Sequence, residues 1–386
     1  MKIGVPAEID GGESRVAATP ETIKKFIAFG ATVVVERGAG LASRITDADY
    51  EAAGATIAPD AAAAVADADV VLKVRRPVES ELPFYRQGAL VIATMDPYGH
   101  EDAVNAMGAA GITAIAMEFM PRITRAQVMD VLSSQANLAG YQAVIDAASA
   151  YDRAMPMMMT AAGTVPAARV FVMGAGVAGL QAIATARRLG AVVTATDVRP
   201  AAKEQVESLG AKFVAVEDEE FKQAETAAGY AKPMSAEYQA KQAALVAEHI
   251  KKQDIVITTA LIPGRAAPRL VTAAMVASMR PGAVLVDLAV ERGGNIEGSK
   301  PGEIVDLDGR RIVGYLNVAG RIPATASQLY AKNLAAFLET LVDKASKALA
   351  VNWDDELVRA TVLTRDGAVV HPAFKPKTVT ADEGSL

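Results

Sequence analysis

Cysteine is absent from this chain of 386 residues, which excludes disulfide bonds and thiolate chemistry and suits a reducing compartment. Only three histidines occur, His100, His249 and His371, and their wide separation is unlike a set of metal ligands. No apolar run reaches the roughly 18 residues of a membrane span, and the first residues lead directly into an expected strand, which predicts no signal peptide. The net charge of -6 argues against nonspecific nucleic-acid binding.

A glycine-rich turn near the middle of the chain joins an expected strand to an expected helix. The apolar run 170–173 ends in Gly174-Ala175-Gly176-Val177-Ala178-Gly179, and 180–189 has the pattern of a helix. In a dinucleotide-binding fold, Gly174 permits the tight turn, Gly176 lets the backbone approach the phosphates, and Gly179 lets helix and strand pack closely. The helix N-terminus then offers N–H groups to a pyrophosphate. A glycine turn that only packs a helix is the alternative.

An acidic residue in the expected place strengthens the dinucleotide interpretation. The next strand, 191–196, ends in Asp197, which lies eighteen residues after Gly179. A carboxylate there accepts hydrogen bonds from the adenosine ribose and repels a 2′-phosphate, which predicts a preference for NAD(H). Arg199, two residues further on, leaves an opening for a 2′-phosphate.

The length and the order of the expected elements predict a two-domain α/β protein. Strands are expected at 3–5, 32–36, 70–74, 89–93 and 113–117 before the glycine turn, and at 212–216, 254–259, 283–288 and 312–315 after it. Helices are expected at 20–29, 47–53, 61–68 and 201–209, with two long ones at 124–153 and 324–350. Hairpins are expected at 157–169 and 358–371.

Because a long helix lies at each end of the dinucleotide-binding part, we expect the C-terminal segment to return to the first domain. The first domain then comprises 1–138 and 322–386 and lacks a glycine fingerprint, while 139–321 binds the nucleotide. Both are expected to be Rossmann-like domains with doubly wound parallel sheets, joined by the long helices. The cleft between them is expected to face the nicotinamide.

A polar group lies at the start of the first long helix. Arg122 is followed by Gln127, Asp130 and Ser133, and these last three recur at intervals of three, which predicts one shared helical face. An Arg122–Asp130 ion pair and a hydrogen bond from Gln127 to a carboxamide are one interpretation, and a solvated helix start is the other. Lys73, at the end of a strand, is the one plausible base in the first domain.

Three further segments are candidates for nucleotide binding or for a subunit contact. The polar stretch 217–242, which holds Gly229 and Tyr230, is either a mobile lid or a surface helix. The strand 254–259 ends in Ala260-Leu261, at the carboxyl edge where ligands of open parallel sheets bind. The exposed apolar residues of the hairpin 157–169 suit a subunit interface, or the hairpin folds on its own domain.

The segment 120–141, which contains the polar group, resembles the signature loop of the proton-translocating nicotinamide nucleotide transhydrogenases. Further segments similar to that family lie at 11–17, 156–164, 224–231 and 287–289. The chain most resembles the separate NAD(H)-binding subunit of the bacterial enzymes. The resemblance implies hydride transfer from bound NADH to NADP⁺ on a partner component, coupled to proton translocation by a membrane component. It also implies a homodimer in the cytoplasm, held peripherally at the inner membrane by its partners.

The resemblance assigns residues to the expected site. It implies that the nicotinamide is positioned by Arg122, Gln127, Asp130 and Ser133. Binding of NAD(H) falls to Gly174, Gly176, Val177, Gly179, Asp197, Val198, Gly229, Tyr230, Ala260 and Leu261. No metal is expected, and NADP(H) is expected on the partner component.

Two other functions fit part of the pattern. The related alanine dehydrogenases share the Lys73 strand and the glycine fingerprint, but carry a catalytic histidine about where Asp96 stands here. A noncatalytic NAD-sensing module is the third hypothesis, and activity with a purified NADP-binding partner would distinguish it from the first.

Overall fold

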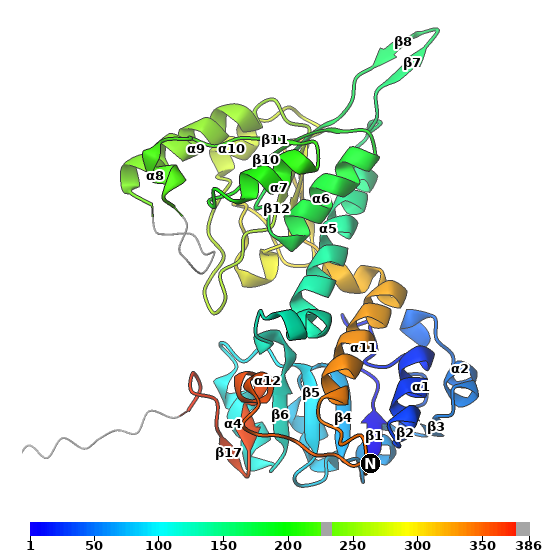
Figure 1. The fold of residues 1–386 in the computed structure, drawn as a ribbon. Helices are drawn as coiled ribbons and strands as arrows, with labels where there is room; N and C mark the ends of the chain where they lie inside the picture. Colours follow the sequence, from blue (N-terminus) through cyan, green and yellow to red (C-terminus); the bar gives the residue numbers. More distant parts are fainter. Residues whose placement is uncertain (225–233, 376–386) are drawn as a thin grey trace, which may run out of the picture. The chain divides into compact units, whose positions relative to one another are not determined.

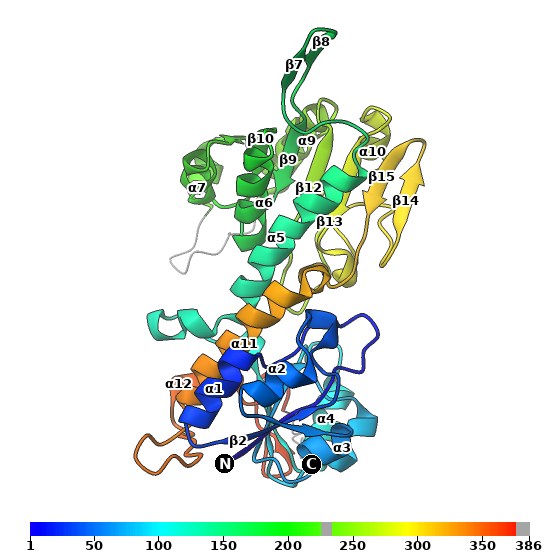
Figure 2. The ribbon, with the colours of Figure 1, turned by 90° about the vertical axis from the view of Figure 1, so that its right-hand side faces the viewer.

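The computed structural model describes residues 1–224 and 234–375. The chain divides into two compact units. Unit 1 comprises Met1–Ser134 and Ile322–Leu386, and unit 2 comprises Gln135–Arg321. Each unit is an α/β structure built on a largely parallel sheet, which confirms the predicted fold class (Figures 1 and 2).

Unit 1 is built on a six-stranded parallel sheet with the order β3-β2-β1-β4-β5-β6. Its strands are β1 (Lys2–Val5), β2 (Thr32–Glu36), β3 (Thr56–Ala58), β4 (Val70–Arg75), β5 (Leu90–Thr94) and β6 (Thr113–Ala116). Its helices are α1 (Pro20–Ala28), α2 (Asp47–Ala52), α3 (Ala61–Val65), α4 (Glu101–Ala109), α11 (Pro323–Glu339) and α12 (Glu356–Thr361). This strand order is that of a doubly wound fold.

Both faces of this sheet are covered, because successive side chains of a strand point to opposite sides. Leu72 belongs to the core that includes α1 and α11, whereas its neighbour Val71 belongs to the core that includes α3 and α4. Burial on both faces explains why the strands are continuous apolar runs in the sequence.

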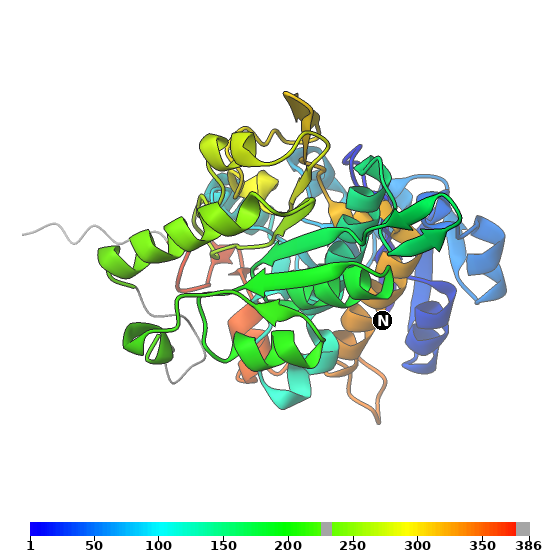
Figure 3. The same ribbon diagram turned by 90° about the horizontal axis from the view of Figure 1, so that it is seen from above.

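Unit 2 is built on a seven-stranded sheet with the order β11-β10-β9-β12-β13-β15-β14, in which only β14 runs antiparallel to its neighbour. Its strands are β9 (Arg169–Met173), β10 (Val192–Thr196), β11 (Lys212–Phe213), β12 (Ile255–Thr258), β13 (Val284–Asp287), β14 (Ile304–Leu307) and β15 (Arg310–Val313). Its helices are α5 (Val131–Ala150), whose first turn belongs to unit 1, α6 (Val177–Arg188), α7 (Ala202–Ser208), α8 (Glu219–Lys222), α9 (Ala236–Ile250) and α10 (Ala273–Ser278). Figure 3 shows helices on either side of these strands.

Helices cover both faces of this second sheet as well. Residues of α5, α6 and α7 share a core with Val170 and Val172, while residues of α9 and α10 share a core with Phe171 and Val256. Among the described residues, no helix is both long and apolar enough to cross a membrane.

The long helix predicted at 124–153 was wrong, because the chain breaks at Asp130. A short 3₁₀ helix, η4 (Thr124–Met129), comes first, and α5 begins at Val131. Asp130 is extended, with ψ of 92°, and its carboxylate accepts the backbone N–H of Ser133 at 2.9 Å. Asp130 therefore caps a new helix instead of continuing the old one.

The long helix predicted at 324–350 was also wrong, since α11 ends at Glu339. The following segment turns back on itself, and an isolated bridge joins Val342 to Leu349. Asp343 accepts hydrogen bonds from the backbone N–H and hydroxyl of Ser346, both at 2.7 Å. Such side-chain bonds to the local backbone compete with helix formation.

Both predicted hairpins are present, although the second is shorter than expected. The first consists of β7 (Met158–Thr160) and β8 (Gly163–Val165), and it stands out from the rest of unit 2 in Figures 1 and 2. The second consists only of β16 (Thr364–Arg365) and β17 (Ala368–Val369), because residues from Glu356 to Thr361 form α12.

Candidate functional site

The glycine turn lies between β9 and α6, at the carboxyl edge of the unit 2 sheet. Gly174 has a φ of +104°, and a Cβ there would lie 2.5 Å from the hydroxyl of Thr259. A Cβ on Gly179 would lie 1.8 Å from the carbonyl oxygen of Gly174. Side chains at these two positions would therefore force the helix away from the strand.

The geometry at Gly176 fits a dinucleotide pyrophosphate. A Cβ at this position would meet no heavy atom within 4 Å, so the backbone borders open space. Gly176 is also the N-cap of the 12-residue helix α6, and no side chain caps it. Val177, the first residue of α6, is 40% exposed. Uncapped N–H groups at the positive end of a helix dipole are suited to a phosphate.

The predicted ribose-binding carboxylate contacts the glycine turn directly. Asp197 accepts the backbone N–H of Ala175 at 2.7 Å through one oxygen. Its other oxygen accepts the backbone N–H and the Nε–H of Arg199, both at 2.9 Å. Arg199 also donates to the carbonyl of Ala175 at 3.3 Å. Asp197 therefore braces the turn, and Arg199 pairs with it, while the neighbouring Val198 is 55% exposed.

A buried asparagine, not singled out from the sequence, fixes the loop that follows β12. The side-chain oxygen of Asn295 accepts the backbone N–H of Ala260 at 3.0 Å, and its amide nitrogen donates to the Ala260 carbonyl at 2.9 Å. Asn295 is fully buried, whereas Leu261 is 54% exposed. The loop holding both predicted residues thus has a rigid base at the carboxyl edge of the sheet.

Asp287 holds Asn295 in turn. One carboxylate oxygen of Asp287 accepts the backbone N–H of Asn295 at 3.2 Å, and the other accepts that of Ile296 at 3.1 Å. A signal for this arrangement in the sequence is the pair Gly293-Gly294, both with positive φ, because such a turn returns the chain to the strand end.

The predicted polar group of unit 1 lies around the break at Asp130, and its members do not share one helical face. Gln127 is exposed on η4, whereas Asp130 and Ser133 bind each other at the start of α5, with 2.6 Å between carboxylate and hydroxyl. Arg122 is exposed before η4. Across residues 1–224 and 234–375, no Arg122–Asp130 ion pair occurs. Prediction of an unbroken helix was the source of this error.

Apolar packing and an ion-pair network anchor the segment that carries Gln127. Ala126 and Met129 are 1% and 5% exposed and join the unit 1 core. Arg125 donates to Asp355 at 2.8 Å and to Glu356 at 3.1 Å, at the start of α12. Gln127 itself thus remains exposed on an anchored support.

Lys73, the one plausible base, is held as an ammonium group. It is 1% exposed, and its Nζ lies 2.8 Å from a carboxylate oxygen of Glu81 and 3.5 Å from one of Glu8. Burial alone would lower the pKa of Lys73, but the two carboxylates outweigh it and raise the pKa. A protonated lysine cannot accept a proton from a substrate.

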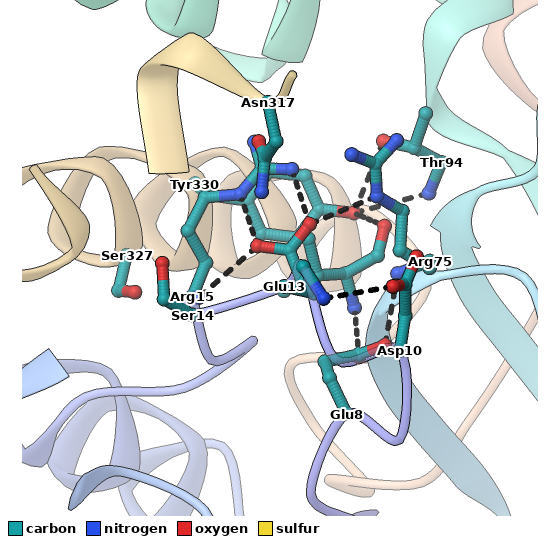
Figure 4. A network of polar contacts seen from close by, with 12 residues as sticks. Glu8, Asp10, Glu13, Ser14, Arg15, Arg75, Thr94, Asn317, Ser327 and Tyr330 are labelled. Atoms are coloured by element: carbon teal, nitrogen blue, oxygen red, sulfur yellow. Dashed lines mark hydrogen bonds and ion pairs between the residues drawn. The ribbon is translucent and has the colours of Figure 1, made fainter. Parts of the chain in front are cut away.

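Two arginines converge on a buried carboxylate close to Lys73. Figure 4 shows Arg15 and Arg75 directed at Glu13, with contacts of 2.7 Å and 2.8 Å respectively. Burial would raise the pKa of Glu13, but the hydrogen bonds and charges of the arginines lower it to about 2. The cationic side chains of this region are therefore already paired with carboxylates of the chain.

The predicted Gly229 and Tyr230 lie outside the described residues. The nearest described helices are α8, before them in the chain, and α9, after them. In the part of the chain that the structure describes, no cluster of histidine, aspartate or glutamate could hold a metal ion.

The comparisons with known proteins identify the family of the chain. The family description "Alanine dehydrogenase/PNT, N-terminal domain" matches residues 4–139, and "Alanine dehydrogenase/PNT, C-terminal domain" matches residues 143–372. The chain belongs to the alanine dehydrogenase/PNT family. Within this family it is a homologue of NAD(P) transhydrogenase alpha subunits, as predicted, and its relatives imply binding of a nicotinamide nucleotide.

Individual relatives of this family cover nearly the whole length of the chain. An NAD(P) transhydrogenase alpha subunit of Rhodospirillum rubrum, named as the first portion of that subunit, is 57% identical, over 97% of this chain and 99% of its own. Alanine dehydrogenase of Halomonas elongata is 31% identical, over 97% of this chain and 95% of its own. The crystal structure of transhydrogenase from Sinorhizobium meliloti is 66% identical with a TM-score of 0.88, over 96% and 100%. A solved structure of L-alanine dehydrogenase is 26% identical with a TM-score of 0.81, and the match covers 97% of this chain and 98% of the other.

Proposed function

We propose that this chain is the NAD(H)-binding component of a proton-translocating transhydrogenase. In this proposal, NADH bound to unit 2 gives a hydride to NADP⁺ that a partner component holds. The names of the relatives as alpha subunits support the existence of partner subunits.

The glycine turn and Asp197 support the binding of NAD(H) rather than NADP(H). The open backbone at Gly176 and the uncapped N-terminus of α6 would hold the pyrophosphate. Asp197 would hold the ribose hydroxyls and repel a 2′-phosphate. Arg199 is paired with Asp197, so this cation is engaged with the carboxylate that would oppose the phosphate.

The pairing of Lys73 with Glu8 and Glu81, together with Asp96 in the place where the resemblance puts the catalytic histidine of the dehydrogenases, supports this proposal over an amino-acid dehydrogenase. Oxidation of an amine releases a proton as well as a hydride, and therefore needs a base. In transfer between two nicotinamides, a C–H bond of NADH breaks with its electron pair and a C–H bond forms on NADP⁺, so no proton moves. Lys73, engaged with Glu8 and Glu81, offers no free base for the first reaction, and the second reaction needs none.

In such a transfer, the chain contributes positioning and the exclusion of water. The bound nucleotide supplies the hydride. Gln127, exposed on its anchored 3₁₀ helix, would orient the carboxamide of the nicotinamide. Arg122 would act beside it, and Asp130 and Ser133 would fix the start of α5, from which this segment departs.

Two exposed surfaces support contacts with other subunits. Val128 and Leu132, 64% and 50% exposed, flank the break at Asp130 and would contact the NADP(H)-binding component. Met157 and Met159 of the hairpin, 59% and 80% exposed, would contact a second copy of the chain in a homodimer. A membrane component coupled to proton translocation would then hold the assembly peripherally at the inner membrane.

The decisive experiment measures hydride transfer from NADH to an NADP⁺ analogue, with and without an NADP-binding partner domain. We expect rapid transfer only with the partner. A parallel titration should show tighter binding of NADH than of NADPH. Binding without transfer would favour a noncatalytic NAD-sensing module, and equal affinities would remove the role given to Asp197.

A further inference from the structure

The break at Asp130 is bridged by one buried amide from a distant part of the chain. Asn333 of α11 donates through Nδ2 to the carbonyl of Val128 at 2.8 Å, just before the break. Its Oδ1 accepts the hydroxyl of Ser134 at 2.7 Å, just after the break. Asn333 is 7% exposed. The amide of Asn333 therefore contacts both η4 and α5. The junction between these two helices sets the direction of Gln127.

The segment that carries Gln127 has little directional restraint of its own. A 3₁₀ helix such as η4 has poor hydrogen-bond geometry, and its last backbone bond, from Asp130 to Gln127, is 3.4 Å long. The buried Ala126 and Met129 hold the segment against the core, but apolar contact is non-directional. The bond from Asn333 to the carbonyl of Val128, which adjoins Gln127, supplies a direction.

Other polar contacts of this region act elsewhere. The cap formed by Asp130 and Ser133 fixes the first turn of α5 but does not reach back to η4. Arg125 binds α12 near the beginning of η4, through an exposed ion pair. The Asn333 amide donates to one side of the break and accepts from the other, which a group that only donates or only accepts cannot do.

We propose that Asn333 is a positioning residue for hydride transfer. It holds the peptide group that follows Val128, the neighbour of Gln127, and so keeps the Gln127 side chain at the angle at which it meets the nicotinamide; it does not contact the nucleotide itself. This inference rests on the proposed function, since it takes Gln127 as the group that acts on the ring. It adds a buried residue of α11 to the site.

The first test compares Asn333→Leu with Thr364→Val in single-turnover transfer and in equilibrium titration with NADH. Both variants remove two buried hydrogen bonds at nearly constant volume, since Thr364 accepts from Ala114 at 3.0 Å and donates to Ile112 at 2.8 Å. A misplacement of about 1 Å costs on the order of 100-fold in rate. We therefore expect Asn333→Leu to slow transfer by roughly 10- to 100-fold with little change in NADH affinity, and Thr364→Val to leave both unchanged. Equal transfer rates in the two variants would overturn the proposal.

The second test needs no activity. Amide hydrogen exchange of residues 124–130 in the chain without nucleotide should become roughly fivefold faster in Asn333→Leu, as expected for one lost hydrogen bond, and remain unchanged in Thr364→Val. Ser134→Ala, the milder variant, should give part of this effect, and its combination with Asn333→Leu should add little, because both changes break one bridge. Unchanged exchange would show that Asn333 does not hold the segment. Absence of transfer in the unmodified chain would instead contradict the proposed function and leave the exchange result to decide on Asn333.

Discussion

At the scale of single residues, Glu13 links the stability of unit 1 to pH. Its side chain is fully buried, and the guanidinium groups of Arg15 and Arg75 face it. Burial opposes ionisation, but these partners hold the pKa at about 2 instead of the ordinary 4.5. A carboxyl lowered in this way stabilises the folded chain by on the order of 3 kcal/mol at neutral pH. The contribution is complete well above pH 4.5 and disappears as the pH falls toward 2.

Glu13→Gln should remove this dependence on pH. The variant removes the buried carboxylate that Arg15 and Arg75 share, so we expect lower stability at pH 7, with a flatter loss of stability between about pH 4.5 and 2. Urea unfolding at a series of pH values measures both effects, and Glu51→Gln, on an exposed carboxylate of unit 1, serves as the control. An acid profile parallel to that of the unmodified chain would contradict the role assigned to Glu13.

Lys73 gives a second prediction at this scale. The two carboxylates beside it favour its protonated form, and the resemblance puts Asp96 where the alanine dehydrogenases are expected to carry histidine. We therefore expect no appreciable NADH formation from L-alanine and NAD⁺, measured by absorbance with purified chain. An authentic alanine dehydrogenase under the same conditions is the positive control. Steady formation of NADH would reverse the preference between the two activities.

Residues whose role depends on local sequence were predictable, and those that act over long separations were not. Gly174 and Gly179 belong to a pattern in which each spacing has a steric reason, and the structure gives that reason at each position. Asn333 contacts Val128 across 205 residues, and Asn295 contacts Ala260 across 35. An isolated asparagine looks like any polar surface residue until the fold buries it.

At the scale of elements, strand positions were predicted more accurately than helix ends. Strands buried on both faces are uniform apolar runs, and such runs are visible in the sequence. The short edge strands β3 and β14 lack this signal and were missed. The two long helices failed for a different reason, because capping by Asp130 and the turn at Asp343 compete with helical continuation without changing the apolar periodicity.

The β7–β8 hairpin carries the prediction that belongs to this scale. Two strands of three residues are too short to be stable in isolation, and Met159, in the middle of β7, is 80% exposed. Contact with a second copy would bury this side chain twice in a symmetric dimer. Burial of a methionine is worth about 1.5–3 kcal/mol, so two copies amount to at least about 100-fold in the dimer dissociation constant.

We expect Met159→Asp to shift the chain from dimer to monomer in sedimentation measurements without loss of thermal stability. Leu41→Asp places the same charge on a residue of unit 1 that is 58% exposed, and it should leave the dimer intact. A monomeric unmodified chain, or a dimer that survives in Met159→Asp, would exclude the hairpin as the dimer contact.

At the scale of the whole molecule, the proposed binding and the proposed chemistry belong to different units. The glycine turn, Asp197 and the Ala260 loop all lie in unit 2, whereas Gln127 lies in unit 1. The sequence indicated two α/β domains because each repeats the alternation of strands and helices, and the doubly wound strand order of unit 1 matches that expectation. How strongly a nucleotide binds and how fast it reacts should therefore respond to different substitutions.

Gln127→Asn tests this separation. The variant keeps the amide but withdraws it by one methylene from the place where it would meet the nicotinamide. Most of the binding free energy is expected from the pyrophosphate at Gly174–Gly179 and the ribose at Asp197, so NADH affinity should change by less than about twofold. The transfer rate should fall on the order of 100-fold, because reacting carbons must approach to about 3–3.5 Å. Single-turnover kinetics with the NADP-binding partner, beside equilibrium titration with NADH, measure the two effects.

Gln87→Asn makes the same change at an exposed glutamine of unit 1 and should alter neither quantity. A normal transfer rate in Gln127→Asn would place Gln127 outside the site, as a solvated residue of η4, whereas an equal loss of affinity would mean that binding and positioning are not divided between the units.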